Sequence, residues 1–304
     1  MTFGIVASLA VLLLQADQIK NLESKVPKDP VAAFQFNKEV AKFIEKNTIS
    51  QPADFLRVGL LINVITFDYR WYRMKYELAI TAAAKGSTEA ESLLPAYWDR
   101  LMISLGRPIR FDVDKFSAND RWGEFFVVQK APDIIVAVVT NPSKHSDIAR
   151  ESKDNTELQA IVDADQKARE NFSKMTPAEL EKMVEEDPKR NRRVREILQL
   201  GELHTSNDFA NASLVLQHSS RFDGFQLAHE LAVCSMLLGD KKTGRWLVGA
   251  SYDRMLNSIG HDQRYGTQYG PEGFKQTDTQ GICDNERLAL GCPKLEEARK
   301  RVFK

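Results

Sequence analysis

Apolar residues recur at helical spacing through most of the chain. In the second half three such runs predict helices, and they cover residues 208–219, 225–238 and 244–259. Asp208 stands at the start of the first run as an N-cap, and Gly239 and Gly260 end the other two. In the first half, Gly86 and Gly106 end helices in the same way. Stacked helical hairpins, and therefore a mainly α protein, are expected.

One stretch departs from this helical pattern. Residues 125–128 and 134–139 are rich in β-branched and aromatic side chains, and Pro132 lies between them. Such a pattern is typical of two strands joined by a turn, so it predicts a small β-hairpin insertion near 122–139. The residues that follow, 141–155, are polar and contain a proline, which indicates a linker between domains.

The chain contains a long internal duplication. Its clearest part is the match between residues 99–111, DRLMISLGRPIRF, and residues 253–265, DRMLNSIGHDQRY, along which the offset stays constant. Shorter matches keep the same order, and they pair Asp17-Gln18 with Asp165-Gln166, Asp29-Pro30 with Asp187-Pro188, and Glu77-Leu78-Ala79 with Glu230-Leu231-Ala232. A repeat of this length predicts two tandem homologous helical domains. We expect a diverged first copy over 16–140, the linker over 141–155 and a second copy over 156–304.

Residues 1–15 form a separate segment that is almost entirely apolar. The segment is too short to span a bilayer comfortably, and Leu14-Gln15-Ala16 fits a signal-peptidase site. The lack of a basic residue before Lys20 counts against a signal peptide. The start of a buried apolar helix therefore stays open as the alternative. The run favours an exported or periplasmic protein over a cytoplasmic one.

Composition narrows the range of partners and cofactors. The 304 residues include 42 basic and 42 acidic ones, so the chain has no net charge with which to bind nucleic acid, and no transmembrane span is expected beyond the N-terminal segment. Cys234, Cys283 and Cys292 lack the spacing of a zinc site, so neither a metal nor a cofactor is expected. Cys283 and Cys292 either pair or stay free. The basic run 189–195 lies beside acidic residues and is interpreted as a solvated helix face.

The duplication allows one copy to be compared with the other. Positions that are alike in both copies are expected to support the fold, and in the second copy they include Asp165, Gln166, Asp253 and Arg254. Positions that differ between the copies are free to bind or react. Those that bring polar groups or a glycine into the second copy are Arg169, Gln217, His218, Gln263, Gly266, Thr267 and Gln268.

Many of these residues fall in short motifs. Residues 263–268 read QRYGTQ, Gln217-His218 forms an upstream QH pair, and a DQ pair at 165–166 and a DR pair at 253–254 accompany them. Together the motifs resemble a bacterial "domain of unknown function" family, numbered 6624, over about residues 160–295. The hexapeptide is the most specific of them. The resemblance implies a shared site and, because that family is uncharacterised, no particular reaction.

The side chains at this site suggest its chemistry. An imidazole changes charge near neutral pH, so His218 is the candidate catalytic acid or base. Substrate binding is expected from the groups around it, namely Gln217, Arg169, Gln263, Arg264, Tyr265, Gly266, Thr267 and Gln268. We expect a metal-independent hydrolase or transferase that acts on a small polar substrate. The alternatives are a non-enzymatic module that binds a small ligand or an envelope partner, and a purely structural hexapeptide whose amides cap helix ends.

Overall fold

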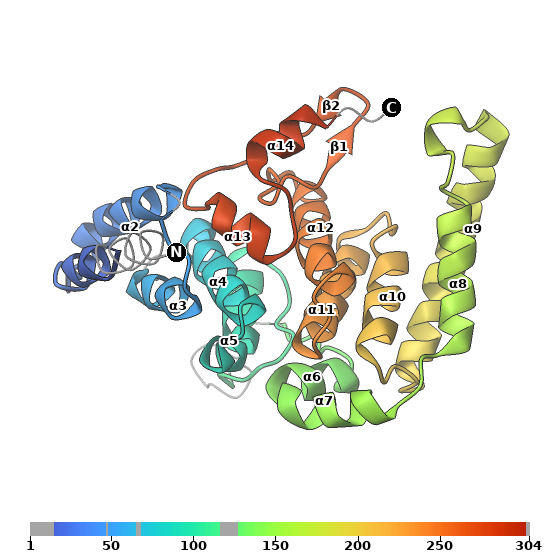
Figure 1. Ribbon diagram of the computed structural model, residues 1–304, viewed down its shortest axis with the longest axis horizontal. Coiled ribbons are helices and arrows are strands. Elements are labelled where there is room, and N and C mark those ends of the chain that lie inside the picture. Colours follow the sequence, from blue (N-terminus) through green and yellow to red (C-terminus); the bar gives the residue numbers. More distant parts are fainter. Residues whose placement is uncertain (1–14, 47, 65–67, 116–126, 302–304) are drawn as a thin grey trace, which may run out of the picture. The chain divides into compact units, whose positions relative to one another are not determined.

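The protein is mainly α-helical. The computed structural model describes residues 15–46, 48–64, 68–115 and 127–301. Within them, β1 (Tyr269–Gly270) and β2 (Gly273–Phe274) pair as one short antiparallel hairpin (Figure 1). The chain divides into two compact units: the first comprises residues 1–130 and 279–286, and the second comprises 131–278 and 287–304.

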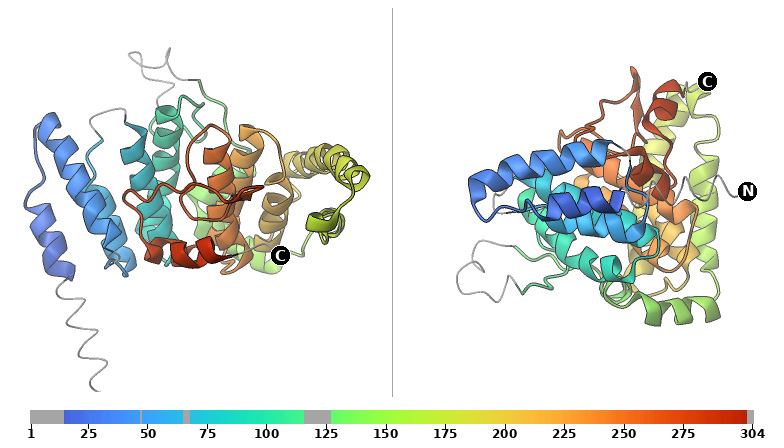
Figure 2. Two further views of the ribbon diagram at one scale, coloured as in Figure 1. Left: turned by 90° about the horizontal axis from the view of Figure 1, so that it is seen from above. Right: turned by 60° about the vertical axis from the view of Figure 1, so that its left-hand side comes forward.

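Four consecutive helices dominate the first unit. They are α2 (Pro30–Glu45), α3 (Pro52–Leu61), α4 (Tyr69–Ala84) and α5 (Thr88–Ser104). The Asp29 carboxylate caps α2 by accepting the amides of Val31 and Ala32, and Ser87 caps α5 by accepting the amide of Ala90. Each of these helices packs on the next one along the chain (Figure 2). Most of α4 is therefore buried.

The first unit also includes a short piece from near the end of the chain. The amide of Gly281 donates a hydrogen bond of 2.9 Å to Glu45 at the end of α2. The side-chain amide of Asn285 donates one of 2.7 Å to the carbonyl of Ile49. Residues 279–286 are thus held by polar contacts to the N-terminal part of the same unit.

The second unit is built from a longer series of helices. They are α6 (Asp133–Thr140), α7 (Pro142–Glu151), α8 (Thr156–Lys167), α9 (Pro177–Gln199), α10 (Ser206–Leu216), α11 (Phe222–Leu237), α12 (Thr243–Asn257), α13 (Asp284–Ala289), which begins in the first unit, and α14 (Leu295–Lys300). A 3-10 turn, Phe172–Lys174, joins α8 to α9. Helices α10, α11 and α12 pack against one another, and α8 and α9 pack beside α10 (Figure 1). Central helix α11 is buried over nearly its whole length.

The three helices predicted in the second half are confirmed as α10, α11 and α12 with small shifts at their ends. One cap differs from the prediction. The N-cap of α10 is Thr205, and Asp208 is the third helical residue, whose carboxylate accepts the amide of Thr205 at 3.1 Å. The two residues satisfy each other's backbone amides, so Asp208 still marks the start of the helix.

The β-hairpin predicted near 122–139 is wrong for its second half, because residues Asp133–Thr140 form α6. The helix buries Ile135, Val138 and Val139, which lie three and four residues apart on one face. Residues 122–126 lie outside the described residues. The expected linker, 141–155, contains α7, whose N-cap is Asn141.

The structure describes only the last residue of the apolar segment 1–15. Residues 1–14 lie outside the described part of the chain, and a helix runs over 15–23. No helix within the described ranges has the length and apolar character that crossing a membrane requires. Cys234, Cys283 and Cys292 are all buried free thiols.

Candidate functional site

The QRYGTQ hexapeptide is organised around the carboxylate of Asp253 near the end of α12. The carboxylate accepts the amides of Arg264 at 2.7 Å, Tyr265 at 3.0 Å and Thr267 at 3.0 Å. It also accepts the Thr267 hydroxyl at 2.8 Å. Because Asp253 is fully buried, these donors stabilise a carboxylate that water does not reach. Burial nevertheless raises the pKa of Asp253 above its usual value.

Other polar groups of the hexapeptide also form hydrogen bonds within the protein. The Gln263 amide nitrogen donates to the carbonyls of Gln268 at 3.1 Å and Lys275 at 2.8 Å, and its oxygen accepts the Gln268 amide at 2.7 Å. The Arg264 guanidinium donates to the carbonyl of Asp278 at 2.6 Å. Gly266 has a φ of 74°, which favours glycine. This geometry favours the structural alternative for QRYGTQ, and substrate binding by these residues stays a prediction.

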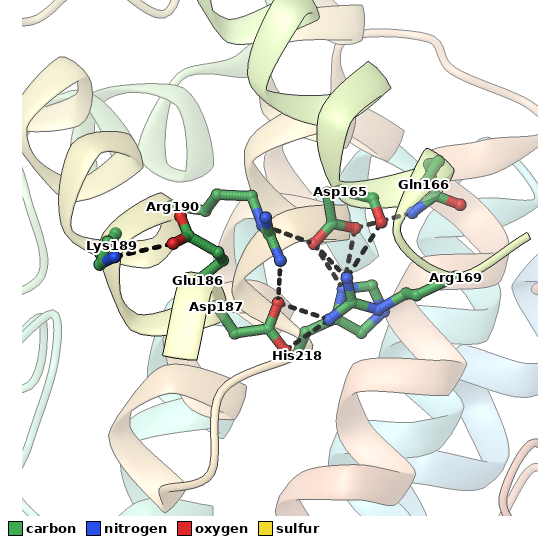
Figure 3. A network of polar contacts seen from close by, with 8 residues as sticks. All are labelled: Asp165, Gln166, Arg169, Glu186, Asp187, Lys189, Arg190 and His218. Atoms are coloured by element: carbon green, nitrogen blue, oxygen red, sulfur yellow. Dashed lines mark hydrogen bonds and ion pairs between the residues drawn. The ribbon is translucent and has the colours of Figure 1, made fainter. Parts of the chain in front are cut away.

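A second polar cluster surrounds His218, directly after the C-cap of α10. Its Nδ1 lies 3.0 Å and 3.2 Å from the two carboxylate oxygens of Asp165 on α8. The Arg169 guanidinium bonds to the same carboxylate at 2.8 Å, and the Gln166 amide bonds to it at 2.9 Å. Asp165 is buried. The structure therefore brings together three predicted residues around His218: Asp165, Gln166 and Arg169 (Figure 3).

Helix α9 adds two residues that the sequence did not identify. Asp187 accepts hydrogen bonds from Arg169 at 2.6 and 2.7 Å and from Arg190 at 2.6 Å. The Nε of Arg190 also lies 3.5 Å from Asp165. Figure 3 shows the two carboxylates alternating with the two guanidinium groups. The basic run 189–195 was interpreted as a solvated helix face. This interpretation is wrong for Arg190, whose side chain is only 13% exposed.

The environment of His218 sets its charge and tautomer. Burial lowers the pKa of His218, and the adjacent Asp165 only partly offsets this effect. The imidazole is therefore neutral at pH 7. Its Nδ1 faces an acceptor, so Nδ1 carries the proton and Nε2 keeps its lone pair. Hydrogen bonding to Asp165 thus holds His218 in the form that accepts a proton at Nε2.

His218 lines a cavity of about 500 Å³ between α9 and the turn from α10 to α11. The cavity is also lined by Asp187, Asn191, Arg192, Arg195, Ser219, Ser220, Arg221 and Asp223, with Val184 and Pro188. Gly224, in the first turn of α11, allows Ser219 to approach the helix closely, because a Cβ there would lie 2.1 Å from the Ser219 hydroxyl oxygen. The size is typical of a small-molecule site. No hexapeptide residue takes part in this lining.

Two further predicted residues lie close to His218 without lining the cavity. Gln217 is buried, and its side-chain oxygen has no hydrogen-bond partner among the described residues. Arg254 is near enough for its charge to lower the pKa of His218, and the charge of Arg169 has the same effect.

The described parts of the chain contain no group of three His, Cys, Asp or Glu side chains that could hold a metal ion.

Comparisons with family models, with curated proteins and with solved structures found no match. The resemblance to the uncharacterised bacterial family therefore stays a prediction that rests on the motifs alone.

Proposed function

We propose that this protein is a hydrolase or transferase that acts on a small polar substrate in the cavity beside α9, with His218 as its general acid and base. The observation that supports this proposal is the Asp165–His218 pair, with 3.0 Å between the nearest carboxylate oxygen and Nδ1. A buried carboxylate behind Nδ1 orients the ring and stabilises the imidazolium that forms when Nε2 takes a proton.

In the proposed reaction, the Asp165–His218 pair carries out the proton transfers. Nε2 of His218 removes a proton from water or a substrate hydroxyl while the oxygen bonds to the reacting centre, and the imidazolium then returns the proton to the leaving group. Arg169 and Arg190 act as positioning residues, because they hold Asp165 and Asp187 in place. The carboxylates of Asp165 and Asp187 neutralise the charges of the two arginines, so in this proposal Arg169 and Arg190 do not bind substrate.

A non-enzymatic module for a small ligand or an envelope partner is the second candidate. The observation that favours it is the arginine-rich lining of the same cavity, which includes Arg192, Arg195 and Arg221. Guanidinium groups recognise anions by charge and hydrogen bonding without any chemical step. The two candidates share one site and differ in whether a product forms.

We also propose that the chain is an ancient duplication in which one copy kept only the scaffold. In the first unit Asp99 accepts the amides of Arg110, Phe111 and Asp112 at 2.8, 2.9 and 2.6 Å. The first two of these amides match those of Arg264 and Tyr265, which Asp253 accepts in the second copy. In addition, Ile109 forms an isolated parallel bridge to Val128, as Gln263 does to Thr277. Val64 occupies the position that matches His218, so the first copy has no imidazole there.

His218→Gln should lower turnover about 100-fold or more, because a glutamine cannot exchange a proton near neutral pH. The measurement is hydrolysis of a panel of chromogenic esters, including p-nitrophenyl acetate and p-nitrophenyl phosphate, by wild type and variant. His204→Gln is the matched control, since His204 is an exposed histidine of the same unit. Equal turnover by His218→Gln and wild type would exclude the acid–base role. Binding without product in any assay would favour the binding module.

The pH profile should carry the signature of a buried base. Because burial lowers the pKa of His218, the imidazole stays neutral below pH 6.5, where an exposed histidine is protonated. Activity should therefore persist on acidification and fall by half only at a pH below 6.5. The measurement is kcat/KM of the free enzyme as a function of pH. An acid limb above pH 6.5 would contradict the proposed role.

A further inference from the structure

The charges that line the His218 cavity are unbalanced. Three arginines and two aspartates face it. One of the aspartates, Asp187, is already neutralised by ion pairs with Arg169 and Arg190 at 2.6 Å. What remains is a single carboxylate, Asp223, opposite the three cavity arginines. Within the cavity, positive charge is therefore in excess.

Asp223 binds its arginines only loosely. It lies 3.4 Å from Arg195 and 3.3 Å from Arg221, and all three side chains are more than a third exposed. Strong pairs between guanidinium and carboxylate groups are shorter, at about 2.7 to 2.9 Å. Arg192 has no acidic partner among the described residues, and it is exposed. Several N–H donors are thus available to an incoming anion.

A neighbouring arginine on the same helix shows the contrast. Arg193 pairs with Glu157 at 2.6 Å and with Glu196 at 2.8 Å. It does not line the cavity. Helix α9 therefore pairs the arginine that points elsewhere and leaves its cavity arginines, Arg192 and Arg195, unpaired or loosely paired. The arginine charge of α9 that close ion pairs do not neutralise thus lies at the cavity.

The start of α11 adds to the same surface. Its N-cap is Arg221, which provides no side-chain cap. The first amides of this 16-residue helix begin at a cavity wall formed by Arg221 and Asp223. Amides at a helix start favour negative charge, so they reinforce the arginines.

We propose that the cavity takes a small phosphate ester, whose phosphate group is held by Arg192 and Arg195 within the space that His218 lines. This inference rests on the proposed function, since it names the substrate class of that site. A phosphate group accepts several guanidinium hydrogen bonds from different directions, which suits more than one arginine and a helix start better than a single planar carboxylate does. The remaining volume of the cavity, about 500 Å³ in all, accommodates the alcohol part of the ester.

The test uses inorganic phosphate as the probe and isothermal titration calorimetry at low ionic strength. Wild type should bind phosphate, and Arg192→Gln and Arg195→Gln should each weaken binding about tenfold or more, as loss of a charge-assisted hydrogen bond predicts. Arg193→Gln removes the same charge from the same helix outside the cavity, so its affinity should stay within about twofold of wild type. Equal weakening by Arg193→Gln would show a non-specific charge effect and overturn the proposal.

Two further outcomes separate this inference from the proposed function. If phosphate fails to bind, or if succinate binds more tightly than phosphate, the phosphate-ester assignment is wrong even where turnover depends on His218. If phosphate binds through Arg192 and Arg195 while no ester is turned over, the anion site is supported and the catalytic role fails.

Discussion

Asp253→Ala should lower the free energy of unfolding by about 3 to 5 kcal/mol, which is typical for breaking a buried charged network. The substitution removes the acceptor of three backbone amides and of one hydroxyl. The loop of residues 263–268 keeps its buried donors but loses their partner, and each unpaired buried donor costs about 1 to 3 kcal/mol. Urea unfolding measures the loss.

Two variants sharpen this experiment. Asp253→Asn keeps the size of the side chain and one carbonyl oxygen, so it should cost less than the alanine. Asp163→Ala removes an exposed aspartate of the same unit and should change the free energy of unfolding by no more than about 0.5 kcal/mol. If Asp253→Ala unfolds at the same urea concentration as Asp163→Ala, Asp253 does not hold the hexapeptide in place.

Acidification from pH 7 to pH 4.5 should remove about 2.5 kcal/mol of stability through His229 alone. Burial lowers the pKa of this α11 residue to about 3, although its hydrogen bond to the Val248 carbonyl opposes the shift. In the unfolded chain the imidazole takes up a proton near pH 6.5, whereas in the folded protein it stays neutral until about pH 3. Unfolding therefore becomes more favourable by about 1.4 kcal/mol for each pH unit below 6.5.

The pH dependence separates this effect from simple loss of packing. His229→Asn retains a donor for the Val248 carbonyl but cannot be protonated, so the free energy of unfolding should vary less between pH 7 and pH 4.5, whatever its value at pH 7. His204→Asn, at an exposed position, should keep the slope of wild type. The prediction fails if His229→Asn and wild type lose equal stability on acidification.

The sequence predicted α10, α11 and α12 well, because their apolar spacing was visible and glycines mark the ends of two of them. Gly239 and Gly260 do adopt positive φ values of 103° and 80° after α11 and α12. The run 134–139 was assigned to a strand because six consecutive apolar residues fit either periodicity. Burial of Ile135, Val138 and Val139 on one helical face decides for α6, and a face of this kind is visible only once the neighbouring α11 is in place.

The candidate site was predicted in part. His218, Asp165 and Arg169 were identified, and they are in contact, because comparison of the two copies isolated short motifs that α8 and α10 bring together. Asp187 and Arg190 were missed, since local charge balance in α9 gives no sign of which residues turn inward. One signal was available: Asp187-Pro188 matches Asp29-Pro30 in the first copy.

The short C-terminal piece of the first unit bears on the order in which the protein folds. The hydrogen bonds from Gly281 to Glu45 and from Asn285 to Ile49 each join residues 236 positions apart. Closing so long a loop costs conformational entropy, and this cost opposes the formation of the two contacts. During synthesis from the N-terminus, the second unit is nearly complete before the first receives its final segment. The N-terminal unit is thus expected to reach its native state only when nearly the whole chain has been synthesised.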